Sequence, residues 1–234
     1  MSTVEAPASH LPLPMQNILS RLAANSTEAE QALVRKAYAY AAAAHAGQVR
    51  LSGEPYLSHP LAVAEVLAEL GFDAHSVAAG LLHDTVEDTK VTLEEVDAEF
   101  GEQVADIVDG VTKISMMTFD SKEEQPENIR KMILAMSHDI RVPIVKLADR
   151  VHNMRTLDFQ KAHKRQRIAQ ETMDIYVPLA NRLGLHRLKL ELEGLSFKYI
   201  HPDVYAQISD WLESNQVVER QLIAKIIDVL EDVG

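Results

Sequence analysis

The segment GLLHDTVEDT, residues 80–89, places one imidazole and three carboxylates within six positions. These groups belong to His83, Asp84, Glu87 and Asp88. Neighbouring carboxylates repel one another unless a cation or shared protons relieve the repulsion. If one helix continues through residue 88, His83 lies over Glu87 and Asp84 over Asp88, because residues four apart share a helix face. The simplest explanation is a bound cation, for which His83 and Asp84 supply two ligands.

Two further candidate ligands stand far from this segment in the sequence. His59, in YLSHP, lies where a loop meets a helix, so its side chain can point into a cleft. Asp149, in KLADR, lies among apolar residues of a predicted helix, where a carboxylate is costly to bury unless a cation or hydrogen bonds satisfy it. Two imidazoles and two carboxylates suit Mn²⁺, Fe²⁺ or another borderline divalent ion. Zinc is the alternative, although it prefers sites richer in nitrogen or sulfur.

The composition restricts the kinds of ligand and location that the chain can have. Its 234 residues carry a formal net charge of −12, which disfavours a broad nucleic-acid surface. A phosphate-bearing ligand would therefore need a local cationic cluster or a metal ion. The chain has no cysteine, which excludes disulfides, thiolate metal sites and cysteine nucleophiles. No signal peptide or apolar stretch of about 18 residues is visible, so we expect a cytoplasmic protein without membrane contact.

Helix start signals recur along the chain while strand signals are almost absent, which predicts an all-α bundle. Thr27 with Glu30 and Thr92 with Glu95 each form a capping-box pattern, and Asp73 can cap the helix that leads into GLLHDTVEDT. These residues mark the expected N-termini of three helices, of which the one after Asp73 carries His83 and Asp84.

The regions between the regular helices are harder to assign. The stretch VRLSGEPYLS, 49–58, is predicted to be a loop or a small hairpin. The polar segment 115–126 is predicted to be irregular and to precede a helix over about 127–137. Asp139 is expected to cap the next helix, and Pro178 to kink a helix over 163–183.

The ordered series of motifs carries a resemblance to a known family. HDTVED, the upstream RLSGEPYLSHP and the downstream KLADRVHNMRTL resemble the HD-domain hydrolases, specifically the hydrolase domain of the RelA/SpoT-type alarmone enzymes. The resemblance implies an HD-domain helical bundle over 26–180, preceded by an arm and a first helix in 1–25. Residues 181–234 resemble the helical connector that leads to a synthetase region in the long bifunctional members. This chain lacks that region, so we expect it as an intramolecular partner in the full-length protein.

The resemblance also assigns roles to individual positions. It implies one Mn²⁺ held by His59, His83, Asp84 and Asp149. It implies a 3′-pyrophosphohydrolase that converts ppGpp or pppGpp to GDP or GTP and pyrophosphate in the stringent response. The catalytic residues would be Glu87 and Asp88, with Glu87 favoured as the base although the sequence leaves their order open. The substrate-binding residues would be Arg50, Ser52, Asn153 and Thr156.

One departure from the family pattern and several simpler interpretations stand beside this reading. Leu51 occupies a position where the family often has a second basic residue, which puts one electrostatic contact with the substrate in doubt. HDTVED alone is equally typical of a charged helix end, and Asp149 alone of a core aspartate paired with an arginine. His152 is either a support for the metal ligands or a packed residue. Alternative functions are hydrolysis of another purine nucleotide and non-catalytic nucleotide sensing.

Overall fold

The computed structural model describes residues 11–116 and 139–215, and no strand occurs within these two ranges, as the all-α prediction requires. In chain order the helices are α1 (Leu13–Leu22), α2 (Glu28–Ala44), α3 (Ser58–Glu69), α4 (Ala74–Leu82), α5 (Thr85–Asp88), α6 (Leu93–Phe100), α7 (Glu102–Ser115), α9 (Arg141–Arg155), α10 (Ala162–Glu171), α11 (Val177–Arg182) and α12 (His186–Ile200). A 3₁₀ turn covers Leu157–Phe159, and a π-helical turn covers Thr172–Tyr176.

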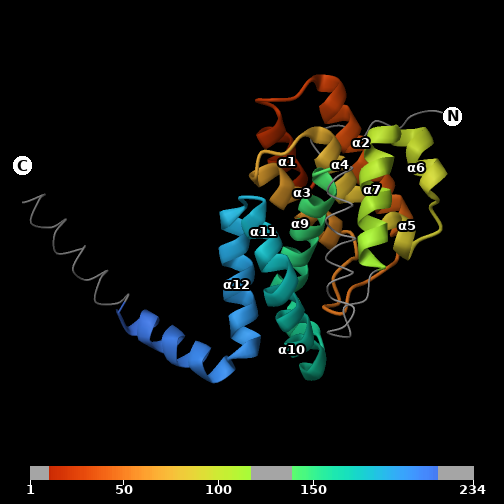
Figure 1. The fold of residues 1–234 in the computed structure, drawn as a ribbon. Coiled ribbons are helices and arrows are strands. Elements are labelled where there is room, and N and C mark those ends of the chain that lie inside the picture. Colours follow the sequence, from red (N-terminus) through yellow and green to blue (C-terminus); the bar gives the residue numbers. More distant parts are fainter. Residues whose placement is uncertain (1–10, 117–138, 216–234) are drawn as a thin grey trace, which may run out of the picture.

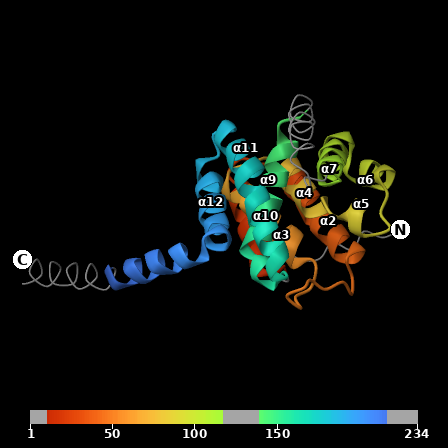
Figure 2. The same ribbon diagram turned by 60° about the horizontal axis from the view of Figure 1, so that its bottom comes forward.

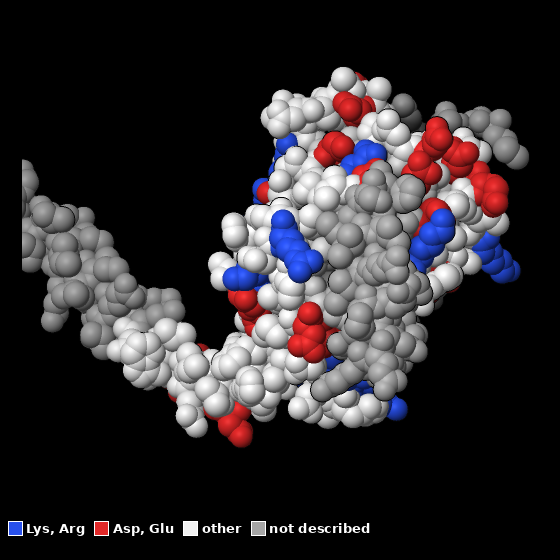
Figure 3. Space-filling model, viewed as in Figure 1, with Lys and Arg blue, Asp and Glu red and all other residues white. Residues whose placement is uncertain are grey.

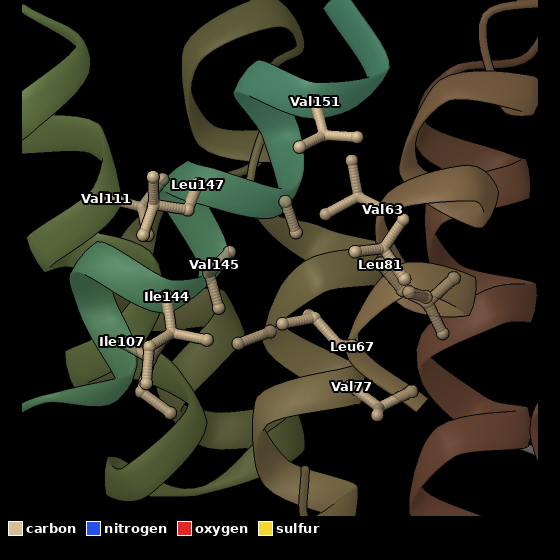
Figure 4. Close-up of a cluster of buried hydrophobic side chains, with 14 of the residues drawn as sticks. Val63, Leu67, Val77, Leu81, Ile107, Val111, Ile144, Val145, Leu147 and Val151 are labelled. Carbon is tan, nitrogen blue, oxygen red and sulfur yellow. The ribbon is translucent and has the colours of Figure 1, made fainter. Parts of the chain in front are cut away.

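Helices α3, α4 and α9 lie at the centre of the bundle, with α6 and α7 on one side and α10, α11 and α12 on the other (Figures 1 and 2). Apolar side chains from α3, α4, α7 and α9 interlock between these helices, as the close-up in Figure 4 shows. Helices α3 and α4 are mostly apolar, whereas α9 has a buried apolar face and charged residues beside it. His59 on α3 and Asp149 on α9 are among the few polar residues buried between these helices.

The predicted caps form as the sequence indicates. The Thr27 hydroxyl accepts from the Glu30 backbone N–H at 3.2 Å, while the Thr27 N–H donates to the Glu30 carboxylate at 2.7 Å. The Thr92–Glu95 pair repeats this arrangement at the start of α6. Asp73 accepts from the Ser76 N–H at 2.7 Å and fixes the first turn of α4. The Asp73 cap fixes the start of α4, the helix that leads into the HDTVED segment.

The helix through HDTVED is not continuous, which corrects the simplest expectation. Helix α4 ends at Leu82, and His83 and Asp84 form a turn before the short α5 begins at Thr85. Both turn residues keep right-handed helical backbone angles, so the chain bends without unwinding. The bend brings the side chains of His83 and Asp84 to a common point, which their spacing on a straight helix would not do.

Two other irregular regions were partly predicted. Residues 49–58 contain one isolated antiparallel bridge, between Val49 and Pro55, so this loop has the start of a hairpin without forming strands. The expected disturbance near Pro178 takes the form of the π-helical turn just before it. Asp139 lies two residues before α9 and accepts from the Arg141 N–H at 2.8 Å. The expected features at 115–126 and 127–137 fall almost entirely outside the described residues.

The C-terminal part of the described chain leaves the bundle. Helix α12 packs against α9, α10 and α11, and residues 202–215 then continue as a helical segment that points away from the body (Figures 1 and 2). Its side chains are nearly all exposed. The predicted region boundaries at 25 and 180 stay predictions. Among the described residues, no helix combines the length and the apolar character that crossing a membrane requires.

Gly110 allows α7 to approach α9 closely. A Cβ atom placed on Gly110 would lie 2.6 Å from a methyl carbon of Val142, a distance that side-chain contacts do not reach. This close approach matters for the site, because α9 carries Asp149 and α7 supports the segment after α4.

We expect Gly110→Ala to destabilise the fold by about 1–3 kcal/mol, because the added methyl group overpacks the α7–α9 contact. Combining it with Val142→Ala should recover part of that loss. Gly194→Ala is the matched control, since its Cβ meets open space on α12 and the change should stabilise by about 0.5–1 kcal/mol. Denaturant unfolding measures all three. Equal effects at Gly110 and Gly194 would contradict the close approach.

Candidate metal centre

Three separate elements deliver the four candidate ligands to one point in the bundle. His59 lies in the first turn of α3, His83 and Asp84 at the α4–α5 bend, and Asp149 in the middle of α9. His59, His83 and Asp149 are almost completely buried. The packing of α3, α4 and α9 against one another therefore forces these side chains together inside an apolar interior.

The distances between the four side chains are those of a compact ligand set. His59 Nε2 lies 3.3 Å from Asp84 Oδ2 and 3.2 Å from Asp149 Oδ1. His83 Nε2 lies 3.0 Å from Asp84 Oδ1 and 3.9 Å from Asp149 Oδ1. Ligand atoms of His59, His83 and Asp149 all lie within 4.8 Å of one another. Asp84 falls outside that three-residue set but contacts both imidazoles.

The hydrogen bonds that the two histidines make through Nδ1 leave the Nε2 atom of each directed at the candidate carboxylates. His83 Nδ1 lies 2.8 Å from the Gly80 carbonyl oxygen, so it carries the proton and donates it. His83 Nε2 is buried and has no hydrogen-bond partner among the described residues. His59 Nδ1 similarly lies 2.8 Å from His152 Nδ1. An orphaned buried nitrogen aimed at two carboxylates fits a divalent ion, because ligating imidazoles are commonly fixed through their other nitrogen.

His152 supports this arrangement directly. Burial and then the nearby charge of His59 lower the pKa of His152 to about 3, so its ring stays neutral and can accept the His59 proton. This contact favours the interpretation of His152 as a support for the ligand over that of a merely packed residue.

Asp149 is held by different partners at its two oxygens. Asn153 Nδ2 donates to Oδ1 at 2.5 Å, and Lys146 Nζ donates to Oδ2 at 2.7 Å. Burial opposes the charge of Asp149, but Lys146 and the imidazoles outweigh it and hold the pKa of Asp149 well below its usual range. The partner expected of a simple core aspartate was an arginine; instead Arg150 pairs with Glu171 and Arg155 with Glu191.

A cavity of about 710 Å³ opens next to these ligands. Its wall contains His59, Asp84 and Asp149 together with four predicted substrate-binding residues, Arg50, Ser52, Asn153 and Thr156. Arg50 Nη2 donates to Asn153 Oδ1 at 3.2 Å, so the 49–58 loop is linked to α9 beside Asp149. Leu51, the departure from the family pattern, is exposed at the rim of the cavity.

The cavity brings cationic side chains next to the carboxylates of an acidic protein. Figure 3 shows acidic side chains gathered over α6 on the face that it views. Lys146 and Arg150 both line the cavity, and Lys146 has a pKa of about 12, because the charge of Asp149 outweighs the effect of burial. Lys146 stands three residues before Asp149 on the same helix face. A phosphate-bearing ligand could meet these two cationic groups in the cavity, although the carboxylates of Asp84, Glu87 and Asp149 line it as well.

Glu87 and Asp88 point to different places. Glu87 lines the large cavity, where burial raises the pKa of its carboxyl and the Ser115 hydroxyl opposes that shift. Asp88 does not line that cavity. It lines a second one of about 620 Å³, and its carboxylate contacts the hydroxyl of Tyr56. The sequence left the order of these two residues open, and only the spatial arrangement separates them.

Tyr56, Ser115 and Arg150 were missed or underweighted as site residues, although all three line the cavity. Tyr56 belongs to the quoted YLSHP stretch and stands three residues before His59, which is the one signal that could have identified it. Ser115 accepts a hydrogen bond from Lys146 at 2.8 Å, a contact between residues 31 apart that no local pattern indicates.

Comparison with protein families and curated relatives places these observations in context. The model of the HD domain matches residues 37–186. The chain is 52% identical over 202 residues to a GTP pyrophosphokinase of Myxococcus xanthus, covering 85% of this chain and 27% of the relative. It is 49% identical over 199 residues to the bifunctional (p)ppGpp synthase/hydrolase SpoT of Escherichia coli, covering 85% of this chain and 28% of that relative.

A third relative and one solved structure agree with these matches. A probable guanosine-3′,5′-bis(diphosphate) 3′-pyrophosphohydrolase of Synechocystis is 50% identical over 207 residues, covering 88% of this chain and 27% of the relative. The solved structure is described as a metazoan ortholog of SpoT that hydrolyses ppGpp. It has a TM-score of 0.53 and 29% identity, and the match covers 71% of this chain and 94% of that one. The chain thus spans about a quarter of the length of the curated relatives.

Metal binding should release a proton at neutral pH. Burial lowers the pKa of His83, but Asp84 and then Asp149 outweigh it and raise the pKa to about 9 in the metal-free protein. Because ligation needs a free lone pair on Nε2, an incoming ion must displace this proton below about pH 9. We expect Mn²⁺ affinity to rise about tenfold per pH unit from pH 7 to 8.5.

Calorimetry in two buffers with different ionisation enthalpies measures the number of protons released. One proton per ion at pH 7.5 is the expected result. An affinity that stays flat between pH 7 and 8.5, with no buffer dependence of the heat, would contradict the assignment of His83.

Proposed function

This chain belongs to the HD-domain family, and from that membership we propose that it is a metal-dependent hydrolase that removes the 3′-pyrophosphate of ppGpp and pppGpp. The products would be GDP or GTP and pyrophosphate, so the reaction would turn over the alarmone of the stringent response. The proposal also draws on the functions named for the relatives, of which this chain spans about a quarter of the length. The cytoplasmic location and a synthetase region elsewhere in the full-length protein stay predictions.

The observation that carries the proposal is the buried set of two imidazoles and two carboxylates beside a cavity that is also lined by Arg50, Lys146 and Arg150. His59, His83, Asp84 and Asp149 would hold one divalent ion. We propose Mn²⁺, since mixed nitrogen and oxygen ligands with room for water suit it. When bound, the ion would polarise the phosphoryl oxygens and the attacking water.

The residues of the chain would carry the proton transfers. Glu87 faces the cavity, and its raised pKa brings its basicity closer to neutral pH, which suits a general base. In the proposed reaction a water molecule loses a proton to Glu87 and attacks the phosphorus attached to the ribose 3′-oxygen. The phosphorus–oxygen bond breaks, and a proton is returned to the 3′-oxygen. Asp88 would assist these proton transfers through its contact with the hydroxyl of Tyr56, which lines the cavity.

The remaining cavity residues would bind the nucleotide. Arg50 and Ser52 both line the cavity, where the flat guanidinium of Arg50 can stack on a base. Asn153 and Thr156 line the wall next to it, one and two turns beyond Asp149 on or just after α9. Lys146 supplies positive charge beside Asp149, and Arg150 lines the same cavity. We propose that these cations face the phosphates and that Arg50 faces the base.

Incubation of the chain with ppGpp and Mn²⁺, with and without a chelator, tests the proposal. Release of GDP and pyrophosphate that stops on chelation is the expected result. Equal or faster turnover of deoxynucleoside triphosphates or cyclic nucleotides would favour hydrolysis of another purine nucleotide. Binding of ppGpp and Mn²⁺ without any pyrophosphate release would favour a nucleotide-sensing module.

Glu87→Gln should lower turnover by about 10²–10⁴-fold while leaving Mn²⁺ and nucleotide binding nearly unchanged, because it removes only the base. Steady-state kinetics and calorimetry measure the two effects separately. Glu94→Gln on the exposed face of α6 is the matched control and should behave as wild type. Turnover that survives Glu87→Gln would assign the base role to another residue.

A further inference from the structure

The hydroxyl of Tyr56 stands between a candidate metal ligand and a candidate catalytic residue. Its oxygen lies 2.9 Å from Asp84 Oδ2 and also contacts Asp88 Oδ2 at hydrogen-bond distance. Tyr56 lines the large cavity, whereas Asp88 lines only the second one. Asp88 therefore reaches the large cavity through the hydroxyl of Tyr56.

A phenol has one proton to donate, so Tyr56 can satisfy only one of the two carboxylates fully at any moment. When the oxygens of Asp84 are engaged as metal ligands, Asp84 is the weaker acceptor and the proton is left to Asp88. The arrangement links the metal centre to the orientation of Asp88 by a single hydroxyl group.

Asp88 is held at a second point by a chain of contacts that returns to the ring of Tyr56. Gln48 Nε2 donates to the Asp88 carbonyl oxygen at 2.9 Å, which leaves Gln48 Oε1 as the acceptor for His45 Nδ1 at 2.8 Å. His45 thus carries its proton on Nδ1. Its ring also stacks on the Tyr56 ring, with centroids 4.5 Å apart and planes 17° from parallel. Buried His45 therefore contacts both Tyr56 and Gln48, the two residues that bind Asp88.

We propose that Tyr56 is a positioning residue for the hydrolysis, because its hydroxyl orients the Asp88 carboxylate relative to the metal ligands. His45 stacks on the Tyr56 ring and binds Gln48, which in turn binds the Asp88 backbone, so these two residues hold Tyr56 and Asp88 in place. The inference rests on the proposed function for its kinetic consequence. The contacts that carry it involve only residues of this chain, so it can also be tested without substrate.

A double-mutant cycle over Tyr56 and Asp88, with Mn²⁺ present, tests the proposal. Tyr56→Phe keeps the ring that stacks on His45 and removes only the hydroxyl. Its kcat should fall by about 10–100-fold with KM within about threefold of wild type, as losses of groups that orient ligands do. The double variant Tyr56→Phe/Asp88→Ala should be no slower than Asp88→Ala alone, because Tyr56 acts through Asp88. Tyr40→Phe, whose ring packs on Phe100, is the matched control and should keep wild-type kinetics.

Losses that multiply in the double variant would overturn the proposal, as would a kcat of Tyr56→Phe within about twofold of wild type. A rise in KM alone would also overturn it, since Tyr56 would then contact the substrate. Denaturant unfolding of the same four proteins gives a readout that needs no turnover. Tyr56→Phe should lower the unfolding midpoint more in the wild type than in Asp88→Ala. If the wild type fails to hydrolyse ppGpp, the proposed function fails. The coupling between Tyr56 and Asp88 in the unfolding midpoints then decides by itself whether Tyr56 orients Asp88.

Discussion

The buried carboxylate of Asp149 is the constraint on which the rest of the structure depends. A carboxylate inside an apolar helix bundle is costly unless opposite charges and hydrogen bonds surround it. Here Lys146 donates to Oδ2, while Asn153 and the two imidazoles face Oδ1. Without a metal ion the imidazoles compensate by holding a proton, which is why the pKa of His83 is raised. The protein therefore contains a cation site whose simplest occupant at low pH is a proton.

The helices act as a frame that brings distant positions to this point. Caps at Thr27, Asp73 and Thr92 fix where helices begin, and Gly110 lets α7 approach α9. The bend at the end of α4 has a separate role, because it turns two consecutive side chains towards one centre and leaves Glu87 facing the cavity. Stability and function thus depend on the same packing of α3, α4, α7 and α9 (Figure 4).

Much of this arrangement could be predicted from the sequence, because capping residues and motif spacing are local signals. The all-α class, the capping boxes and the family followed from them, and the HD-domain match bears out the resemblance. The bend at His83 and Asp84 has no comparable signal, since both residues keep helical backbone angles. The place of Tyr56 and Ser115 in the site could not be predicted for a different reason. Their contacts join residues about 30 positions apart, and only tertiary packing decides where such side chains meet.

Anomalous X-ray diffraction from crystals grown with Mn²⁺ tests the central claim most directly. The account predicts one strong anomalous peak, coordinated by the Nε2 atoms of His59 and His83 and by the carboxylates of Asp84 and Asp149. A peak outside these four side chains, or His83 with Nε2 turned away from a bound ion, would contradict it.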